Sequence, residues 1–141
     1  MHIQFFSEDT DFVLEDNLAN IKSWVSTIAS DHEHDIKDLN YIFCSDNYLL
    51  SINQEYLKHD YFTDIITFDH SDEQASIEGD IFISIDRVKE NANEHGASFE
   101  NELHRVMAHG LLHLLGFGDK TPAEKTEMRL KEDACLSLLK R

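Results

Sequence analysis

A long apolar run that carries two histidines constrains this chain more than any other stretch of its sequence. The segment RVMAHGLLHLLGFGDKTPAE spans positions 105–124, and its histidines, His109 and His113, are four residues apart. The apolar spacing predicts a helix that Ser98 caps and that is apolar on nearly all sides. A helix of this kind belongs in the interior of a protein. Gly116 supplies the stop, so the sequence predicts a buried central helix with both histidines near its end.

The rest of the chain alternates short β-branched or aromatic runs with runs of helical periodicity. Strands are expected over 3–6, 38–45, 63–70 and 79–86. Helices are expected over 14–34, over 47–57 with Asp46 as N-cap, and over 87–96, 98–115 and 121–139. The last helix begins with the capping box TPAE, which has proline at the first helical position. The sequence therefore predicts one α+β domain over residues 1–141, in which a four-stranded mixed sheet packs against about five helices and a metal site lies at the end of the buried helix.

The composition leads us to expect a cytoplasmic protein that does not enter a membrane. No apolar run approaches the roughly 20 residues that a membrane span requires. The N-terminus lacks the basic segment of a secretory signal and becomes acidic by Glu8. The two cysteines, Cys44 and Cys135, occur in a strand-like and a helix-like run, which favours buried thiols in a reducing compartment over a disulfide.

The charge of the chain is strongly negative and unevenly distributed. A net charge of −16 argues against indiscriminate binding of polyanions. Six of the 12 basic residues lie in the last 22 positions, beside four acidic ones, so the acidic excess belongs to positions 1–119. The basic tail, which ends in Lys140 and Arg141, fits either a solvated helix with charge pairs or a local basic face for a partner.

The two histidines predict a metal site. Residues i and i+4 project from one face of a helix, where two neutral imidazoles can bind one ion. Gly118 is expected to give the following loop the freedom to return over the helix, which makes Asp119 the first residue able to supply a third ligand. Two histidines and one carboxylate leave a coordination position for water, as in catalytic zinc sites. The alternative is that Asp119 only favours the start of the next helix through its dipole.

The spacing of the histidines does not predict a zinc protease. The H-E-x-x-H pattern of those enzymes has a glutamate directly after the first histidine, which serves as the general base. Gly110 occupies that position in this chain. The proton acceptor for peptide hydrolysis is therefore missing, and a water activated at this site must lose its proton to another group.

Two segments of the chain resemble a known family. HGLLHLLGFGD matches the pattern H-G-x-L-H-L-x-G-(Y/F)-D-H from His109 through Phe117. INQEYLKHDYFTDIITFD, followed by EGDIFIS, is similar to LN-x-x-Y-R-x-K-D-x-P-T-N-V-L-S-F-P followed by G-D-I. Both patterns belong to the YbeY-type rRNA maturation endoribonucleases, which are metal-dependent hydrolases of bacteria. The resemblance covers nearly the whole chain in length and element order.

The resemblance implies a zinc-dependent endoribonuclease that cleaves single-stranded RNA in maturation of the small-subunit rRNA 3′ end and in ribosome quality control. It implies one Zn²⁺ per chain held by His109, His113 and Asp119, with another divalent metal left open. Expected partners are rRNA and the ribosome or a ribosome-associated protein, and no DNA is expected. Attack on phosphorus by water or by the ribose 2′-OH fits the sequence equally, and no residue is assigned as catalytic.

The chain departs from the family pattern at several positions. Asp119 stands where the third histidine is usual, and Gly118 where aspartate is usual. The extra negative charge is expected to make a bound water less acidic than in an all-histidine site. Leu57 replaces an arginine that would offer a guanidinium to phosphate. The neighbouring Lys58 and His59 are therefore the candidate substrate-binding residues, with a merely solvated lysine as the alternative at position 58.

Other functions stay open at this point. Leu57 favours a metal-stabilised ribosome assembly factor that binds RNA without cutting it. A metal-dependent hydrolase of another phosphoester or an amide would use the same ligands. Two histidines and a carboxylate also suit Fe(II) in oxygen chemistry, although nothing else in the sequence supports that use. Phe62 and Asp64, which replace the usual proline and asparagine, are expected to reshape the edge of the cleft.

The charge distribution predicts weak and salt-sensitive binding to naked RNA. Phosphate contacts usually come from Lys and Arg, and this chain has few of them outside its tail. Titration of labelled single-stranded RNA at increasing salt should therefore give a low affinity that falls steeply. A tight complex that salt does not weaken would contradict this expectation.

Overall fold

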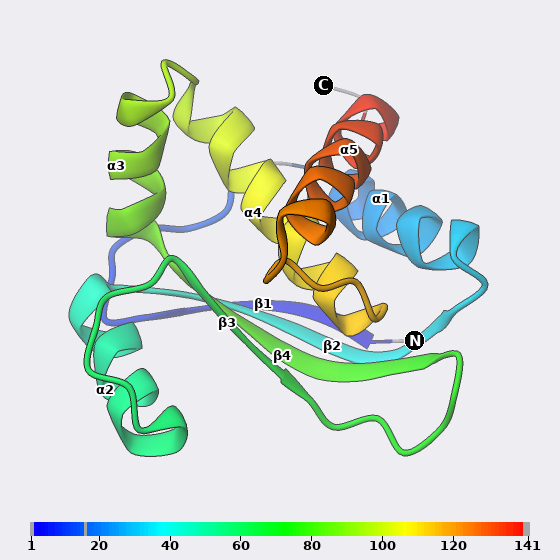
Figure 1. The fold of residues 1–141 in the computed structure, drawn as a ribbon, viewed down its shortest axis with the longest axis horizontal. Helices are drawn as coiled ribbons and strands as arrows, with labels where there is room; N and C mark the ends of the chain where they lie inside the picture. Colours follow the sequence, from blue (N-terminus) through cyan, green and yellow to red (C-terminus); the bar gives the residue numbers. More distant parts are fainter. Residues whose placement is uncertain (1, 16, 140–141) are drawn as a thin grey trace.

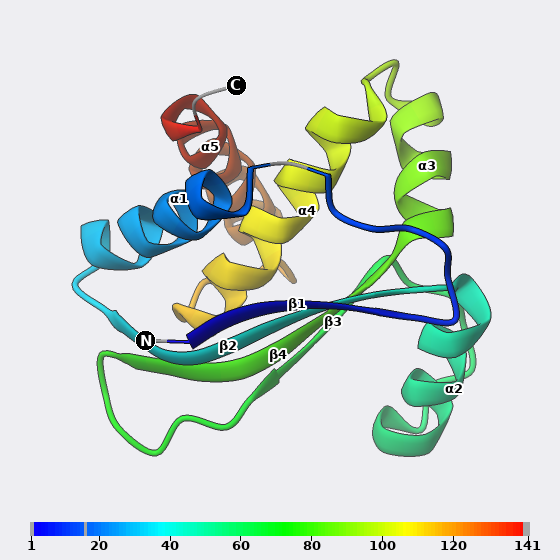
Figure 2. The same cartoon turned by 180° about the vertical axis from the view of Figure 1, so that it is seen from behind.

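A four-stranded sheet lies beneath most of the helices in the computed structural model, which describes residues 2–15 and 17–139 (Figure 1). The strands are β1 (His2–Glu8), β2 (Asp35–Cys44), β3 (Ile65–Asp69) and β4 (Ser76–Ser84). The helices are α1 (Leu18–Asp31), α2 (Asp46–Leu57), α3 (Ile85–Glu94), α4 (Phe99–Leu114) and α5 (Pro122–Leu138). Seen from either side, α1, α4 and α5 cover one face of the sheet, whereas α2 lies at one end beyond the other face (Figure 2). The expected α+β domain is confirmed.

The sheet is mixed, as the sequence predicts. Its strand order is β1-β2-β4-β3, with β1, β2 and β4 parallel and β3 antiparallel to β4 at one edge. Phe5 pairs with Tyr41, and Tyr41 pairs with Ile81, so these three side chains share one face of the sheet. The β3 edge borders the histidine end of α4, because Ile65 and Thr67 line a cavity together with both histidines.

The two faces of the sheet have separate apolar clusters. Alternation along β2 points Leu39, Tyr41 and Phe43 into the main core with α1 and α4. The smaller cluster on the opposite face consists of Cys44, Leu49, Ile52 and Ile66, which lie in β2, α2 and β3. Cys44 and Cys135 are both buried and free, as the sequence predicts. Burial raises the pKa of Cys44 to about 12 and that of Cys135 to about 11, which makes both thiols poor nucleophiles.

β1, β2 and β4 are longer than the sequence predicts, whereas β3 and the first helix are shorter. β2 begins at Asp35 instead of 38, and β4 begins at Ser76, inside the polar segment expected to be a loop. α1 begins at Leu18 instead of 14, because the side chain of Asn17 accepts a hydrogen bond from the backbone N–H of Asn20. Pairing with neighbouring strands supplies hydrogen bonds that keep polar residues in the sheet regardless of their propensity.

The helix caps are confirmed in two cases and corrected in one. Ser98 and Thr121 cap α4 and α5 as predicted, and the capping box of Thr121 is complete. The N-cap of α2 is Ser45, so the prediction of Asp46 was wrong. Asp46 is instead the first helical residue, and its carboxylate pairs with Arg87 of α3 at 2.7 Å.

The basic tail and the apolar content of the helices can be compared with the expectations from composition. Within the basic tail, Lys131 lies over the ring of Phe117, with its Nζ 5.0 Å from the ring centroid. Lys140 and Arg141 lie outside the described residues, so the choice between a solvated helix and a partner face stays open. Of the helices in the described part of the chain, none has the length and apolar character needed to cross a membrane.

α4 is the buried central helix that the apolar run predicts (Figure 1). It lies between the sheet and α5, with α3 at its N-terminal end (Figure 1). The hydroxyl of Tyr41 donates to the carbonyl oxygen of Met107 at 3.1 Å, which satisfies a buried polar group and ties β2 to α4.

Gly110 explains how α4 approaches the sheet so closely. A Cβ at this position would lie 2.8 Å from Cδ1 of Ile65 and 2.8 Å from Cγ2 of Ile81. The side of the helix at Gly110 therefore faces β3 and β4. A glutamate at this position, as in the zinc proteases, would meet the sheet, so the absence of that residue follows from the packing.

Gly110→Ala should destabilise the protein despite the better helix propensity of alanine. The propensity gain is about 1 kcal/mol, whereas overpacking of a filled core costs about 1–3 kcal/mol, so a net loss is expected in denaturant unfolding. A double-mutant cycle with Ile65→Val should show favourable coupling, because valine lacks the Cδ1 that the new methyl group would meet. Increased stability of Gly110→Ala would show that the interface between α4 and the sheet can accommodate a methyl group.

Candidate metal centre

Three side chains at the C-terminal end of α4 and in the loop after it converge on one point. His109 Nε2 lies 3.0 Å from His113 Nε2 and 3.3 Å from Asp119 Oδ2. His113 Nε2 lies 3.5 Å from the same carboxylate oxygen. The group could hold a metal ion, and it consists of the three residues that the sequence predicts as ligands.

The turn after α4 brings Asp119 back over the histidines. Gly116 has φ of +104°, a conformation that favours glycine. Its N–H donates to the carbonyl of His113, and the N–H of Phe117 donates to the carbonyl of Leu112, each at 3.0 Å. This pair of hydrogen bonds is a Schellman motif, which ends the helix and reverses the chain. The stop predicted from Gly116 is confirmed.

Gly118 has a different role from the one that the sequence suggests. Among the described glycines, the left-handed conformation occurs at Gly96 and Gly116 but not at Gly118. A Cβ at Gly118 would lie 2.5 Å from Oε2 of Glu124, whose other oxygen, Oε1, accepts a hydrogen bond from the Thr121 N–H in the capping box. The prediction that Gly118 supplies backbone freedom was therefore wrong. Its small size leaves room for the capping carboxylate.

The donor atoms fit a tetrahedral zinc ion. With bonds of about 2.0–2.1 Å, neighbouring donors in such a site are roughly 3.3–3.4 Å apart. The three separations of 3.0, 3.3 and 3.5 Å bracket this spacing. Two imidazoles and one carboxylate are a common donor set for zinc with one position left for solvent or substrate. The same donors suit other divalent ions, such as Fe²⁺.

A cavity of about 370 Å³ opens beside the three candidate ligands. Its other lining residues are Tyr61, Thr63, Asp64, Ile65 and Thr67, from β3 and the segment before it. Burial raises the pKa of Asp64 above the ordinary aspartate value, although the nearby charges of His109 and Arg87 oppose the shift. The cavity therefore combines hydroxyl groups, a carboxyl group that holds its proton more readily than usual, and the candidate metal centre.

The two histidines differ in their affinity for protons. Burial lowers the pKa of His109, but the hydrogen bond and charge of Glu132, with the charge of Asp119, outweigh burial and raise it. Burial and the neighbouring charge of His109 lower the pKa of His113. In the metal-free protein a proton therefore resides on His109 in preference to His113. A divalent ion would displace that proton as it binds.

No pattern in the sequence indicated a carboxylate behind His109. Glu132 of α5 lies with Oε2 at 2.6 Å from His109 Nδ1, and its Oε1 accepts a hydrogen bond from Arg105 at 3.0 Å. Glu132 is 23 residues from His109, on another helix. No local spacing rule relates two such positions. A polar residue between Met128 and Cys135, both buried on α5, was the available signal.

Lys58 and His59 lie near the cavity but do not line it. Lys58 ends α2 in the left-handed conformation, and its Nζ donates to the carbonyl of Glu55 at 3.3 Å. His59 stacks on Tyr61 at 5.1 Å between ring centroids, and its Nδ1 lies 3.0 Å from the Tyr61 hydroxyl. Because Tyr61 lines the cavity, His59 is connected to the site through that ring, whereas Lys58 is turned toward its own helix.

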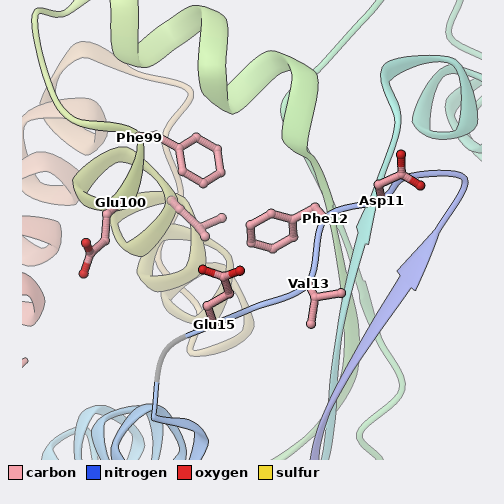
Figure 3. Close-up of a pocket in the computed structure, with 7 residues that line it drawn as sticks. Asp11, Phe12, Val13, Glu15, Phe99 and Glu100 are labelled. Atoms are coloured by element: carbon pink, nitrogen blue, oxygen red, sulfur yellow. The ribbon is translucent and has the colours of Figure 1, made fainter.

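A second hollow lies at the opposite end of α4 from the histidines (Figure 3). Phe12 and Phe99 lie edge to face, with ring centroids 5.8 Å apart, and Glu15 lies below Phe12 in this view (Figure 3). Asp11 and Glu100 add two more carboxylates to its lining. A hollow of about 500 Å³ whose charged groups are all negative repels phosphate, so it is not a candidate site for RNA.

Fold and site together define a small α+β protein with a candidate His/His/Asp metal centre at the end of its central helix. The model of the family described as Endoribonuclease YbeY matches residues 2–140. An Endoribonuclease YbeY from Cytophaga hutchinsonii is 59% identical over 138 residues, covering 98% of this chain and 96% of the relative. One from Flavobacterium psychrophilum is 49% identical over 135 residues, covering 94% of each chain.

A solved structure has the same fold. The solution structure of TM1509 from Thermotoga maritima has a TM-score of 0.69 with this chain and 28% sequence identity, covering 97% of this chain and 88% of that one. The chain belongs to the Endoribonuclease YbeY family, and the resemblance inferred from the histidine segment is confirmed.

Substitution of two of the three candidate ligands, His113 and Asp119, should separate metal binding from helix capping. His113→Ala should abolish stoichiometric zinc, and Asp119→Ala should weaken zinc by more than about tenfold, because each removes a donor atom. Asp119→His should keep zinc, since an imidazole nitrogen would replace the carboxylate oxygen as donor. Metal content after dialysis and competition with a chromophoric chelator would measure these changes. Exposed Asp72 gives the matched control Asp72→Ala. Wild-type affinity in Asp119→Ala would assign Asp119 to helix entry alone.

Proposed function

We propose that this protein is a zinc-dependent, single-strand-specific endoribonuclease that acts in maturation of the small-subunit rRNA 3′ end and in ribosome quality control. The observation that carries the proposal is the convergence of His109, His113 and Asp119 beside a polar cavity, in a chain of the Endoribonuclease YbeY family. The relatives named above are endoribonucleases by name.

The donor set is suited to hydrolysis of a phosphodiester. When bound, a divalent ion supplies polarisation of a phosphoryl oxygen and lowers the pKa of an attacking hydroxyl. His109 and His113 would hold the ion through Nε2, and Asp119 would contribute a carboxylate oxygen. All three residues line the cavity, so a substrate bound there would lie next to an ion held by them. Attack by water and attack by the ribose 2′-OH both use this arrangement.

The remaining cavity residues are suited to holding single-stranded RNA. The hydroxyls of Thr63 and Thr67 and the ring of Tyr61 line the cavity, and they offer hydrogen bonds to phosphate or ribose and an aromatic face to a base. His59 extends that face by stacking on Tyr61. Lys58 is exposed, so its side chain can leave the Glu55 carbonyl and meet a phosphate. These two residues therefore contact substrate at the edge of the cavity in our proposal.

The acidic charge supports a proposal in which this protein cleaves RNA and a partner brings it to its substrate. A net charge of −16 gives RNA little general attraction to the protein. We therefore expect the ribosome or a ribosome-associated protein to bring the enzyme to rRNA, in the cytoplasm. Leu57, an apolar residue at the end of α2 that offers no charge to phosphate, supports one competing function, a metal-stabilised assembly factor that binds without cutting.

Cleavage of a single-stranded RNA that carries an rRNA 3′ extension tests the proposal. Wild type and His113→Ala would be purified identically and assayed with and without a chelator, beside Asp72→Ala as control. We expect cleavage by wild type and Asp72→Ala alone, lost on chelation. Equal cleavage by His113→Ala would reveal a contaminating nuclease. Zinc in the wild type with no cleavage, even with ribosomes added, would favour the assembly factor.

The same assay tests the substrate-binding residues. Lys58→Ala and His59→Ala should each raise KM about threefold to tenfold while kcat and zinc content stay unchanged, because they remove contacts to bound RNA. Lys22→Ala, an exposed lysine on α1, is the matched control for lost positive charge. An unchanged KM in Lys58→Ala would leave position 58 as a solvated helix end.

A further inference from the structure

Behind the candidate metal centre, four side chains of α4 and α5 form a continuous chain of hydrogen bonds. His109 Nδ1 meets Glu132 Oε2 at 2.6 Å, and Glu132 Oε1 accepts from Arg105 Nη1 at 3.0 Å. Arg105 Nη2 then donates to Asp133 at 2.7 Å. The Glu132 side chain is 8% exposed and that of Arg105 is 14% exposed. Such an arrangement is rigid, because both carboxylate oxygens of a buried glutamate are occupied.

The carboxylate decides which nitrogen of His109 carries hydrogen. A carboxylate only accepts hydrogen bonds, so the neutral imidazole must present an N–H at Nδ1. Its lone pair is then at Nε2, the atom that lies 3.0 Å from His113 and 3.3 Å from Asp119. In the opposite tautomer Nε2 would carry hydrogen and could not bind a metal. The hydrogen bond from Nδ1 to Glu132 therefore leaves the lone pair of Nε2 available to a metal.

α5 is what holds the carboxylate in place. Met128 and Cys135, one turn before and one turn after Glu132, are both buried in the main core. Arg105 joins Glu132 to α4 and compensates its negative charge, without which a buried carboxylate is costly. The orientation of His109 consequently depends on the packing of α5 against α4.

We propose that Glu132, clamped by Arg105, is a positioning residue that selects the metal-binding tautomer of His109. This inference rests on the metal centre of the proposed function. It adds a requirement that the three ligands alone do not contain, since all three can be intact while the imidazole presents the wrong nitrogen.

Glu132→Gln reverses the preference without changing the shape of the side chain. Arg105 is a donor only, so the amide oxygen of glutamine should turn toward Arg105. The amide NH₂ group would then face His109 Nδ1 and donate to it, which favours hydrogen on Nε2. Zinc affinity should fall roughly 10- to 100-fold, the range typical of lost partners behind a metal-binding histidine. Zinc affinity should fall less in Glu132→Asp, which keeps the carboxylate.

Asp133→Asn is the matched control. This substitution removes one negative charge from the position next to Glu132 on the same helix. Asp133 also pairs with Arg105, but its side chain is 55% exposed, and its partner is Arg105 and not His109. It should keep zinc affinity within about twofold, since exposed charge pairs contribute little. Zinc affinity would be measured by chelator competition, and thermal unfolding of each metal-free variant would show that it folds.

A second measurement does not depend on metal. Long-range ¹H–¹⁵N correlation spectra of the metal-free protein at mildly alkaline pH identify the tautomer of each neutral histidine. We expect Nδ1–H for His109 in the wild type and Nε2–H in Glu132→Gln. Nε2–H in the wild type would overturn the inference even if no variant folds, and so would wild-type zinc affinity in Glu132→Gln. A wild type that binds no zinc but shows Nδ1–H would instead overturn the metal centre of the proposed function.

Discussion

The structure depends on the close packing of α4 against the sheet. Because Gly110 has no side chain, the helix backbone lies against Ile65 and Ile81, and the Tyr41 hydroxyl binds the Met107 carbonyl. A helix held on several sides in a densely packed core cannot rotate without opening gaps or creating clashes. The histidine face of α4 is therefore fixed relative to β3, and the rigidity of the candidate metal centre is a consequence of core packing, not of the histidines themselves.

Two local motifs then determine where Asp119 lies. The Schellman motif at Gly116 ends α4 and reverses the chain, and the capping box at Thr121 starts α5. The few residues between them are held at both ends, so Asp119 has little freedom to leave the histidines. The carboxylate of Glu124 occupies the space beside Gly118, which gives a steric reason for glycine at this position. A carboxylate ligand thus arises from a short loop with an ordered beginning and end.

Electrostatics connects this site to the composition of the whole chain. Asp64, Asp119 and Glu132 all lie near His109, in a protein whose net charge is −16. Phosphate would be repelled from such a centre unless a cation offset the carboxylates. A divalent ion at the three donors would supply that charge at the point where the scissile phosphate must approach. The ion would then serve both attraction and chemistry.

The features that depend on neighbours within one helical turn were predictable from the sequence. The shared face of His109 and His113, the stop at Gly116 and the capping box at Thr121 follow from helix geometry over three or four residues. The cap of α2 was misassigned because Ser45 and Asp46 are both good caps, and the contact with Arg87 that occupies Asp46 comes from another helix. Three features follow from contacts between elements: Glu132 meets His109, strand pairing extends β2 and β4, and the small Gly118 leaves room for Glu124. Such contacts join residues on separate elements, and their distances are set by packing, which no local spacing encodes.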